Sequence, residues 1–254
     1  MARIKLAYIG GGSTRAAGTM VSFIEQGHNF DGSEVVLIDL DAERLDLVRR
    51  LSEKVVRSKG IDLKISTTLD RRAGLQDCDA ALTSFRPGGF EARYLDESIP
   101  LKHGVIGQET QGPGGFFMAL RSIHAIQPMI KDMEDICPNA ILFNYTNPIN
   151  ILSEAITHHS AIPTVSLCEG PIVFPYDIAR AAQLDPLKME AVMIGLNHAC
   201  WSVQHSYGGQ PLMPLLADAY ERRSADRKVP ARDLRMLHLA LTMDSLPAAY
   251  FQYY

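Results

Sequence analysis

The chain has 254 residues, of which 46% are hydrophobic and 21% charged, and these proportions are ordinary for a globular protein with a sizeable core. Its formal net charge of -4 shows no basic excess, so the composition argues against nucleic acid or an anionic membrane as a partner. Apolar runs fall short of the ~20 residues that span a bilayer, and the four cysteines lack paired spacing, so we expect a cytoplasmic protein with reduced thiols.

Short β-branched runs alternate with helical segments through the first half of the chain. The expected strands cover residues 4–9, 34–38, 63–68, 80–85 and 140–145, and the expected helices cover residues 16–26, 41–58 and 116–136. This alternation predicts an α/β fold, a doubly wound, Rossmann-like parallel sheet with helices on both faces. We assign it to a first domain, residues 1–150.

The remaining residues, 151–254, read as the start of a second, α+β domain. A helix is expected after Asn147-Pro148, then a strand over residues 164–168 and a helix opened by Pro171. Two strands over residues 190–195 and 201–207 follow, and the tail from Pro214 is expected to be helical.

The segment Gly10-Gly11-Gly12-Ser13 follows the first expected strand and opens the next helix. Glycines there let the backbone approach a pyrophosphate, whose charge meets the N–H groups at the helix N-terminus. Asp39 follows the second strand, where a carboxylate can bind a ribose diol and repel a 2′-phosphate. The glycine loop and Asp39 together therefore predict binding of NAD. Arg15 replaces the third glycine of G-x-G-x-x-G, and a tight turn without a ligand is the alternative.

Further motifs occur in order along the chain. They are Phe85-Arg86-Pro87-Gly88-Gly89 with Glu91-Ala92-Arg93, Gly107-Gln108-Glu109-Thr110, Asn144-Tyr145-Thr146-Asn147-Pro148, Leu167-Cys168 and Gly195-Leu196-Asn197-His198. With the glycine loop, this set resembles glycoside hydrolase family 4, the NAD- and Mn²⁺-dependent glycosidases. The resemblance covers essentially the whole chain and implies the N-terminal part of a longer enzyme, with a lactate/malate-dehydrogenase-like fold and a substrate- and metal-binding second domain.

The resemblance also implies the metal ligands. Cys168 and His198 match them, and a thiolate and an imidazole suit Mn²⁺ or another divalent ion. Two protein ligands leave open positions for a substrate. Taken alone, Cys168 would more often be a buried apolar thiol and His198 a structural hydrogen-bonding residue.

Asn147 and Arg93 match substrate-binding positions of the family, and Arg86 is expected to assist Arg93. Asn147 ends a strand of the sheet, where ligands of open α/β sheets bind, and the guanidinium groups of Arg93 and Arg86 suit a phosphate or a pair of hydroxyls. The alternatives are an asparagine that caps the next helix and two ordinary surface arginines.

Tyr250 resembles the tyrosine base of the family, and Glu169 occupies the position of the acidic proton donor in its α-specific members. An ordinary phenol has a pKa of ~10, so a nearby cation is needed for it to act as a base. The alternative for Tyr250 is an aromatic cluster that packs against the remaining half of the longer enzyme. The surrounding loops resemble the β-specific branch, so Glu169 and the loops favour different anomers.

The activity implied by the resemblance is hydrolysis of a phosphorylated glycoside, for which we expect a 6-phospho-β-glucoside. The implied route is transient oxidation of sugar C3 by NAD, removal of the C2 proton, elimination of the aglycone and return of the hydride. A homo-oligomer, dimer or tetramer, is also implied. Two alternatives stay open: a lactate/malate-type NAD-dependent dehydrogenase, and an inactive fragment that binds NAD.

Overall fold

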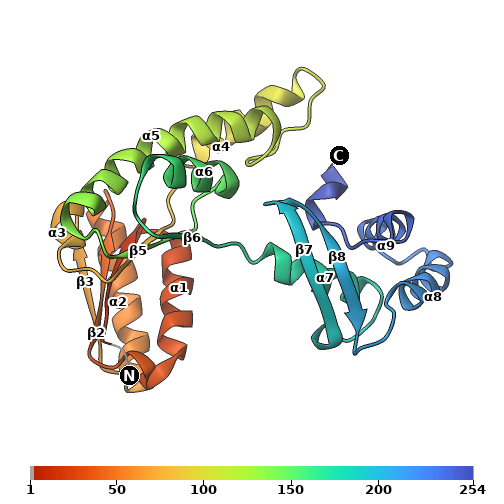
Figure 1. The fold of residues 1–254 in the computed structure, drawn as a ribbon, viewed down its shortest axis with the longest axis horizontal. Helices are drawn as coiled ribbons and strands as arrows, with labels where there is room; N and C mark the ends of the chain where they lie inside the picture. Colours follow the sequence, from red (N-terminus) through yellow and green to blue (C-terminus); the bar gives the residue numbers. More distant parts are fainter. Residues whose placement is uncertain (1–2, 254) are drawn as a thin grey trace. The chain divides into compact units, whose positions relative to one another are not determined.

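The computed structural model describes residues 3–253 and divides into two compact units, Met1–Leu167 and Cys168–Tyr254 (Figure 1). The first unit contains a six-stranded parallel sheet in the order β3-β2-β1-β4-β5-β6. The strands are β1 Lys5–Ile9, β2 Ser33–Ile38, β3 Leu63–Thr68, β4 Ala80–Thr83, β5 Ile141–Asn144 and β6 Thr164–Ser166. The order reverses between β1 and β4, and ligands of such sheets bind at the carboxyl edge beside that point. The predicted Rossmann-like sheet is confirmed.

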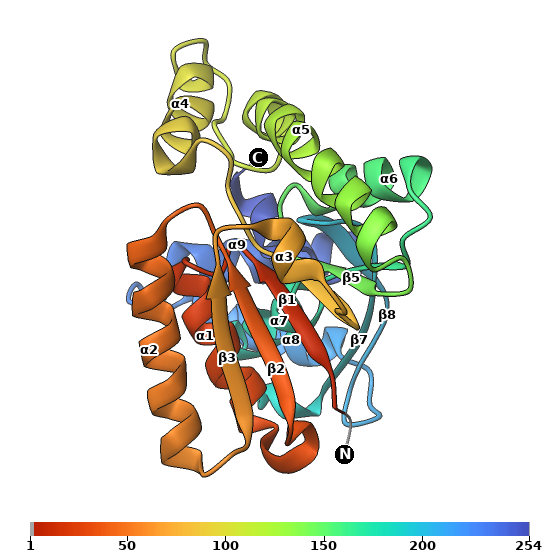
Figure 2. The ribbon, with the colours of Figure 1, turned by 90° about the vertical axis from the view of Figure 1, so that its left-hand side faces the viewer.

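Helices cover both faces of this sheet (Figure 2). They are α1 Thr14–Glu25, α2 Ala42–Lys59, α3 Arg71–Leu75, α4 Gly89–Leu101, α5 Gly112–Ile136 and α6 Ile149–His159. The central strand β1 shows why two layers are needed, because Leu6 and Tyr8 pack into the core cluster with α1 and α2, whereas Ala7 and Ile9 pack into the cluster with α5 and α6. A strand that buries both faces reads as a continuous apolar run, as β1 does.

The second unit is built on an antiparallel hairpin of β7 (Met189–Leu196) and β8 (Ala199–Tyr207). Its helices are α7 Gly170–Ala181, α8 Met213–Ser224 and α9 Ala231–Met243, with short 3-10 turns at Gly27–Phe30 in the first unit and at Pro186–Lys188 and Ala249–Tyr253 here. One core cluster joins α7, α8 and α9, and a second surrounds Phe174 and Cys200. The predicted α+β character of this part is confirmed.

The division between the units falls later than residue 150, where the sequence placed it. Strand β6 pairs with β5, and Leu152 and Ile156 of α6 are buried in the core of the sheet, so both elements belong to the first unit. In the described part of the chain, no helix is both long and apolar enough to cross a membrane.

Candidate functional site

The glycine loop packs closely against the carboxyl end of β2 and the residue that follows β4. The N–H groups of Gly10 and Gly11 both donate to the carbonyl oxygen of Ile38, each at 2.9 Å. Gly10 has φ +94°, and a Cβ added there would lie 2.0 Å from the carbonyl oxygen of Ser84. Ser13 caps α1, since its Oγ accepts a hydrogen bond from the N–H of Ala16 at 3.1 Å. Only glycine therefore fits at position 10, and the loop leads directly into a helix N-terminus, the arrangement that binds phosphates.

Asp39 is fixed at the mouth of this loop. Its Oδ2 accepts a hydrogen bond from the N–H of Gly12 at 2.8 Å, and its Oδ1 accepts one from Leu40 at 2.7 Å. A carboxylate has about four acceptor sites, so both oxygens keep capacity for a ribose diol. The structure thus brings the glycine loop and Asp39 together, as the nucleotide prediction requires.

Arg86 and Arg93 converge on one carboxylate, that of Glu109. The distance to Glu109 Oε2 is 2.6 Å from Arg86 Nη2 and 3.4 Å from Arg93 Nη1, and the Glu109 side chain is 14% exposed. Arg93 also donates from Nε to Glu97 at 2.8 Å. The motif containing Glu109 does not by itself assign the residue this holding role, because the two arginines reach it only through the fold.

A buried donor of Arg86 remains available at this cluster. Its Nη1 is buried and has no hydrogen-bond partner among the described residues. A buried donor without a partner costs about 1–3 kcal/mol. An anionic or hydroxyl oxygen of a ligand would remove that cost, so Arg86 is suited to bind one.

Asn147 lies in the loop that follows β5 at the carboxyl edge of the sheet. Its main-chain oxygen accepts a hydrogen bond from Ser122 Oγ at 3.1 Å, which ties the loop to α5. Its side-chain Oδ1 is buried without a hydrogen-bond partner in the described part of the chain. Helix α6 begins after the cis Asn147-Pro148 peptide without a side-chain cap, so the alternative of a capping asparagine is not observed.

Asn144, at the end of β5, holds this loop in place. Its fully buried amide accepts hydrogen bonds from Thr83 Oγ1 and from the N–H of Thr146, both at 3.0 Å, and donates to Ser166 Oγ at 3.3 Å. Phe85 N–H donates to Thr146 Oγ1 at 3.3 Å, so the loop that carries Arg86 is tied to the loop that carries Asn147. The motif and the three strands were predicted from the sequence, but the order of the sheet, which sets β5 between β4 and β6, was not.

In the second unit, Cys168 and Glu169 lie immediately before α7. The half-buried sulfur of Cys168 accepts a hydrogen bond from the N–H of Gly170 at 3.4 Å, which orients it at the helix N-terminus. Burial raises the pKa of the Cys200 thiol, and the neighbouring Cys168 raises that pKa further. Cys168 therefore lies near Cys200, a member of the core cluster that includes Phe174.

His198 and Tyr250 meet at the same cluster. Their rings stack with centroids 3.8 Å apart and planes 10° apart, and Tyr250 also contacts the edge of Phe174 at 5.8 Å between centroids. Tyr250 packs against the cluster that contains Cys200. Tyr250 therefore packs against side chains of the second unit itself, and this packing places it on the imidazole of a candidate metal ligand.

Cys168 and His198 offer a sulfur and a nitrogen donor in this neighbourhood, which fits a divalent transition ion. Within residues 3–253, no group of three His, Cys, Asp or Glu side chains is placed to hold a metal ion. A site with only two protein ligands would leave open positions, which substrate oxygens could occupy.

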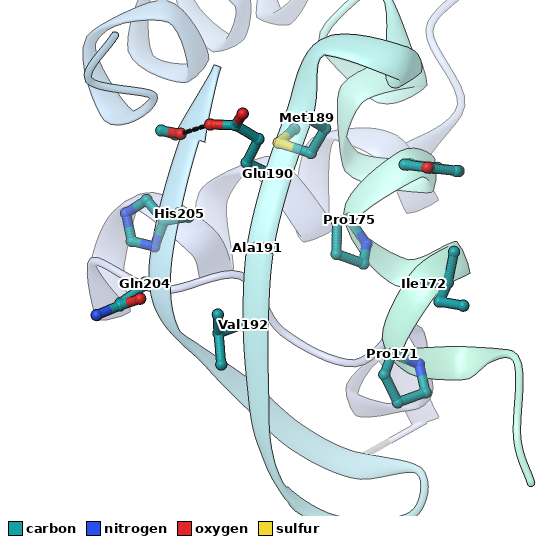
Figure 3. Close-up of a pocket in the computed structure, with 11 residues that line it drawn as sticks. Pro171, Ile172, Pro175, Met189, Glu190, Ala191, Val192, Gln204 and His205 are labelled. Atoms are coloured by element: carbon teal, nitrogen blue, oxygen red, sulfur yellow. Dashed lines mark hydrogen bonds between the residues drawn. The ribbon is translucent and has the colours of Figure 1, made fainter. Parts of the chain in front are cut away.

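A separate groove of about 590 Å³ lies between α7 and the β7–β8 hairpin (Figure 3). Pro171 and Pro175 form one wall, Val192 and His205 lie on the strands, and Glu190 accepts a hydrogen bond from Ser206. Neither Cys168 nor His198 is among the residues that line it.

The family described as "Family 4 glycosyl hydrolase" matches residues 5–184 of this chain. The "Probable 6-phospho-beta-glucosidase" of Bacillus subtilis (strain 168) is 41% identical over 198 residues, which cover 77% of this chain and 45% of that protein. The 6-phospho-beta-glucosidase of Escherichia coli (strain K12) is 33% identical over 265 residues, 99% of this chain and 58% of that protein. The chain thus spans about half the length of these curated relatives.

Solved structures give a consistent result. A 6-phospho-alpha-glucosidase from gut microorganisms, in complex with NAD and Mn²⁺, has a TM-score of 0.86 and 28% identity and covers 99% of this chain and 60% of its own. The 6-phospho-beta glucosidase from Thermotoga maritima, with NAD and glucose-6-phosphate, has a TM-score of 0.79 and 27% identity, covering 99% and 59%. Malate dehydrogenase from Cryptosporidium parvum has a TM-score of 0.64 and 14% identity, covering 99% and 74%, which is a likeness of fold alone.

Proposed function

Since the chain belongs to the family 4 glycosyl hydrolases, we propose that the full-length protein hydrolyses 6-phospho-β-glucosides with NAD and a divalent metal ion as cofactors. The observation that supports the proposal is the stacking of Tyr250 on the buried ring of His198, beside the core cluster that contains Cys200, whose pKa Cys168 raises. The β anomer is proposed because the relative at 41% identity is named for it.

The first unit would bind the nucleotide and the sugar. The glycine loop with the N-terminus of α1 would bind the pyrophosphate, and Asp39 the adenosine ribose. The buried Arg86 Nη1 and Asn147 Oδ1 offer one donor and one acceptor to substrate oxygens, and Arg93 would assist Arg86.

The second unit would hold the metal ion and move protons. When bound, NAD supplies a reversible hydride acceptor for sugar C3 and the ion supplies a Lewis acid. Cys168 and His198 would hold the ion, whose positive charge would favour a phenolate at Tyr250, the ring that stacks on His198. Tyr250 would then take the C2 proton, and Glu169 would protonate the leaving oxygen.

The proposal also covers location and assembly. We propose a cytoplasmic protein, in which the four cysteines are free thiols. We propose a homo-oligomer with a small phosphorylated glycoside as its substrate; the Thermotoga maritima relative was solved with glucose-6-phosphate.

The test is hydrolysis of aryl 6-phosphoglucosides of both anomers by the full-length protein, with and without NAD⁺, Mn²⁺ and a thiol reductant. We expect turnover of the β anomer only when all three are present, with uptake of solvent deuterium at product C2. Tyr250→Phe should lower kcat by about 10²–10⁴-fold, whereas Tyr220→Phe, the matched control, should not. Equal hydrolysis by metal-free, cofactor-stripped protein would reject the proposal. Net NADH release from a 2-hydroxy acid would instead indicate a dehydrogenase.

A further inference from the structure

Most backbone donors of the glycine loop already have acceptors within the protein. The N–H groups of Gly10 and Gly11 donate to the carbonyl oxygen of Ile38, and the N–H of Ser13 donates to that of Gly10 at 3.2 Å. The N–H of Gly12 donates to the carboxylate that follows β2. A dinucleotide pyrophosphate is a dianion, and the donors left for it are the N–H groups at the start of α1, which lack an intrahelical acceptor. A cation beside the loop would complete such a site.

Arg15, the second residue of α1, brings a cation to this position. Its Cζ lies over the ring of Tyr145 at 5.3 Å from the ring centroid, which is close enough for a cation–π contact. Tyr145 follows β5, and its N–H donates to the carbonyl oxygen of Thr83, the last residue of β4, at 2.8 Å. Since β4 lies between β1 and β5, the Arg15 side chain reaches across the carboxyl end of β4, beside the point where the strand order reverses.

The packing of α1 leaves Arg15 free to reach that far. In the motif G-x-G-x-x-G, the third glycine permits close packing of the helix against the strand. Here the next residue, Ala16, takes that place, because it is fully buried in the core cluster that contains Leu6 and Tyr8 of β1. Arg15 itself is exposed. The arginine therefore does not crowd the strand, and its side chain is available to a ligand.

We propose that Arg15 is a cofactor-binding residue, whose guanidinium binds the pyrophosphate of NAD at the N-terminus of α1. Within residues 3–253, Arg15 forms no ion pair, whereas Arg44, which also lies beside the loop, is paired with Asp41 at 3.3 Å. The contact with Tyr145 occupies the face of the guanidinium, so the N–H donors in its plane remain available for phosphate oxygens. This inference rests on the nucleotide part of the proposed function and adds a residue that the glycine motif does not contain.

The 6-phosphate of the substrate is a second source of the same chemistry. The pyrophosphate is favoured because Arg15 belongs to the helix turn that offers its N–H groups to the nucleotide. The arginines proposed for the substrate, Arg86 and Arg93, lie together on Glu109 instead.

Calorimetric titration of the full-length protein with NAD, ADP and adenosine tests the assignment. Arg15→Ala should weaken the binding of NAD and ADP about tenfold, because it removes charge-assisted hydrogen bonds to phosphate. Binding of adenosine, which has no phosphate, should be unchanged, and this also shows that the variant is folded. Arg15→Lys should recover part of the loss, since lysine keeps the charge without the planar fork.

The aromatic contact and the charge each have a matched variant. Tyr145→Leu should weaken ADP binding about threefold, because the guanidinium loses the ring that positions it, whereas Tyr145→Phe keeps the ring and should bind normally. Arg57→Ala removes a 70% exposed arginine from the C-terminal end of α2 and should change nothing.

Equal binding of ADP by the wild type and Arg15→Ala would overturn the inference, and so would an equal loss for ADP and adenosine. A loss confined to Arg44→Ala would assign the role to that residue. If Arg15→Ala weakens glucose 6-phosphate, titrated with NAD present, more than it weakens ADP, then Arg15 binds the substrate phosphate instead. A wild-type protein that binds neither NAD nor ADP would contradict the proposed function as well, whereas NAD binding that is insensitive to residue 15 contradicts only this inference.

Discussion

His198 holds a backbone conformation that costs free energy for any residue with a Cβ. It is the second residue of the two-residue turn that joins β7 to β8, and its φ is +64°. Glycine or asparagine is usual where a turn needs a positive φ. His198 is 4% exposed and its ring stacks on Tyr250, so the positive φ of the turn directs the imidazole toward the interior. Strain of this kind is typically kept where a side chain has a function.

Comparing His198→Ala with His198→Gly isolates the backbone cost. Both variants delete the imidazole, but only alanine keeps a Cβ in the left-handed region, so the glycine variant should be more stable by about 1 kcal/mol. Urea unfolding of the two variants measures the difference. Equal stabilities would mean that the turn relaxes to a negative φ once the ring is lost.

The sheet could be predicted from sequence because its strands are buried on both faces, which produces continuous apolar runs such as that of β1. Helices α3 and α4 were not predicted. Helix α3 has only five residues, and α4 buries Asp96 while exposing Phe90, so its pattern does not mark an inner face. At the candidate site, the sequence motifs identified single residues but not the contacts between them. The sharing of Glu109 by Arg86 and Arg93 depends on packing between segments, which no local pattern records.

The short helix α3 is held to α5 through Asp132. Arg71 Nε donates to Asp132 Oδ2 at 2.7 Å, and Arg72 pairs with the other oxygen. Burial acts to raise the pKa of Asp132, but the hydrogen bonds from Arg71 and Arg72 outweigh it, so the folded pKa is lowered. A lowered pKa means that ionised Asp132 stabilises the fold above its unfolded pKa of about 3.9. This stability is lost as the pH falls through the folded value.

Asp132→Asn should therefore lower the free energy of unfolding by about 2 kcal/mol at pH 7, and the deficit should shrink as the pH falls below about 4. Denaturant unfolding at a series of pH values measures both effects. Asp135→Asn is the matched control. Asp135 is half-exposed and its distance to Arg72 is a longer 3.5 Å, so this substitution should change the free energy of unfolding little. A deficit for Asp132→Asn that does not vary with pH would contradict the ionic explanation.

Each core cluster of the molecule lies wholly within one unit. The two clusters on the faces of the sheet are built from residues up to Ile162, and the other two from Phe174 onward. The glycine loop and Asp39 belong to the first unit. A unit of 167 residues is well above the size at which a single core becomes marginal. The first unit should therefore fold and bind its nucleotide without the second.

A fragment of residues 1–167 should bind NAD within about fivefold of the full chain's affinity, equivalent to about 1 kcal/mol. Calorimetric titration measures this, and Gly10→Ala should abolish it in the same fragment, because the added Cβ would lie 2.0 Å from the Ser84 oxygen. A fragment of residues 1–150, cut at the boundary expected from sequence, loses β6 and most of α6. That cut exposes Leu142 and removes Leu152 and Ile156 from the core, so the shorter fragment should fail to fold cooperatively. If it instead folds and binds NAD as tightly as residues 1–167, the earlier boundary is right, and β6 and α6 contribute nothing to the stability of the nucleotide-binding unit.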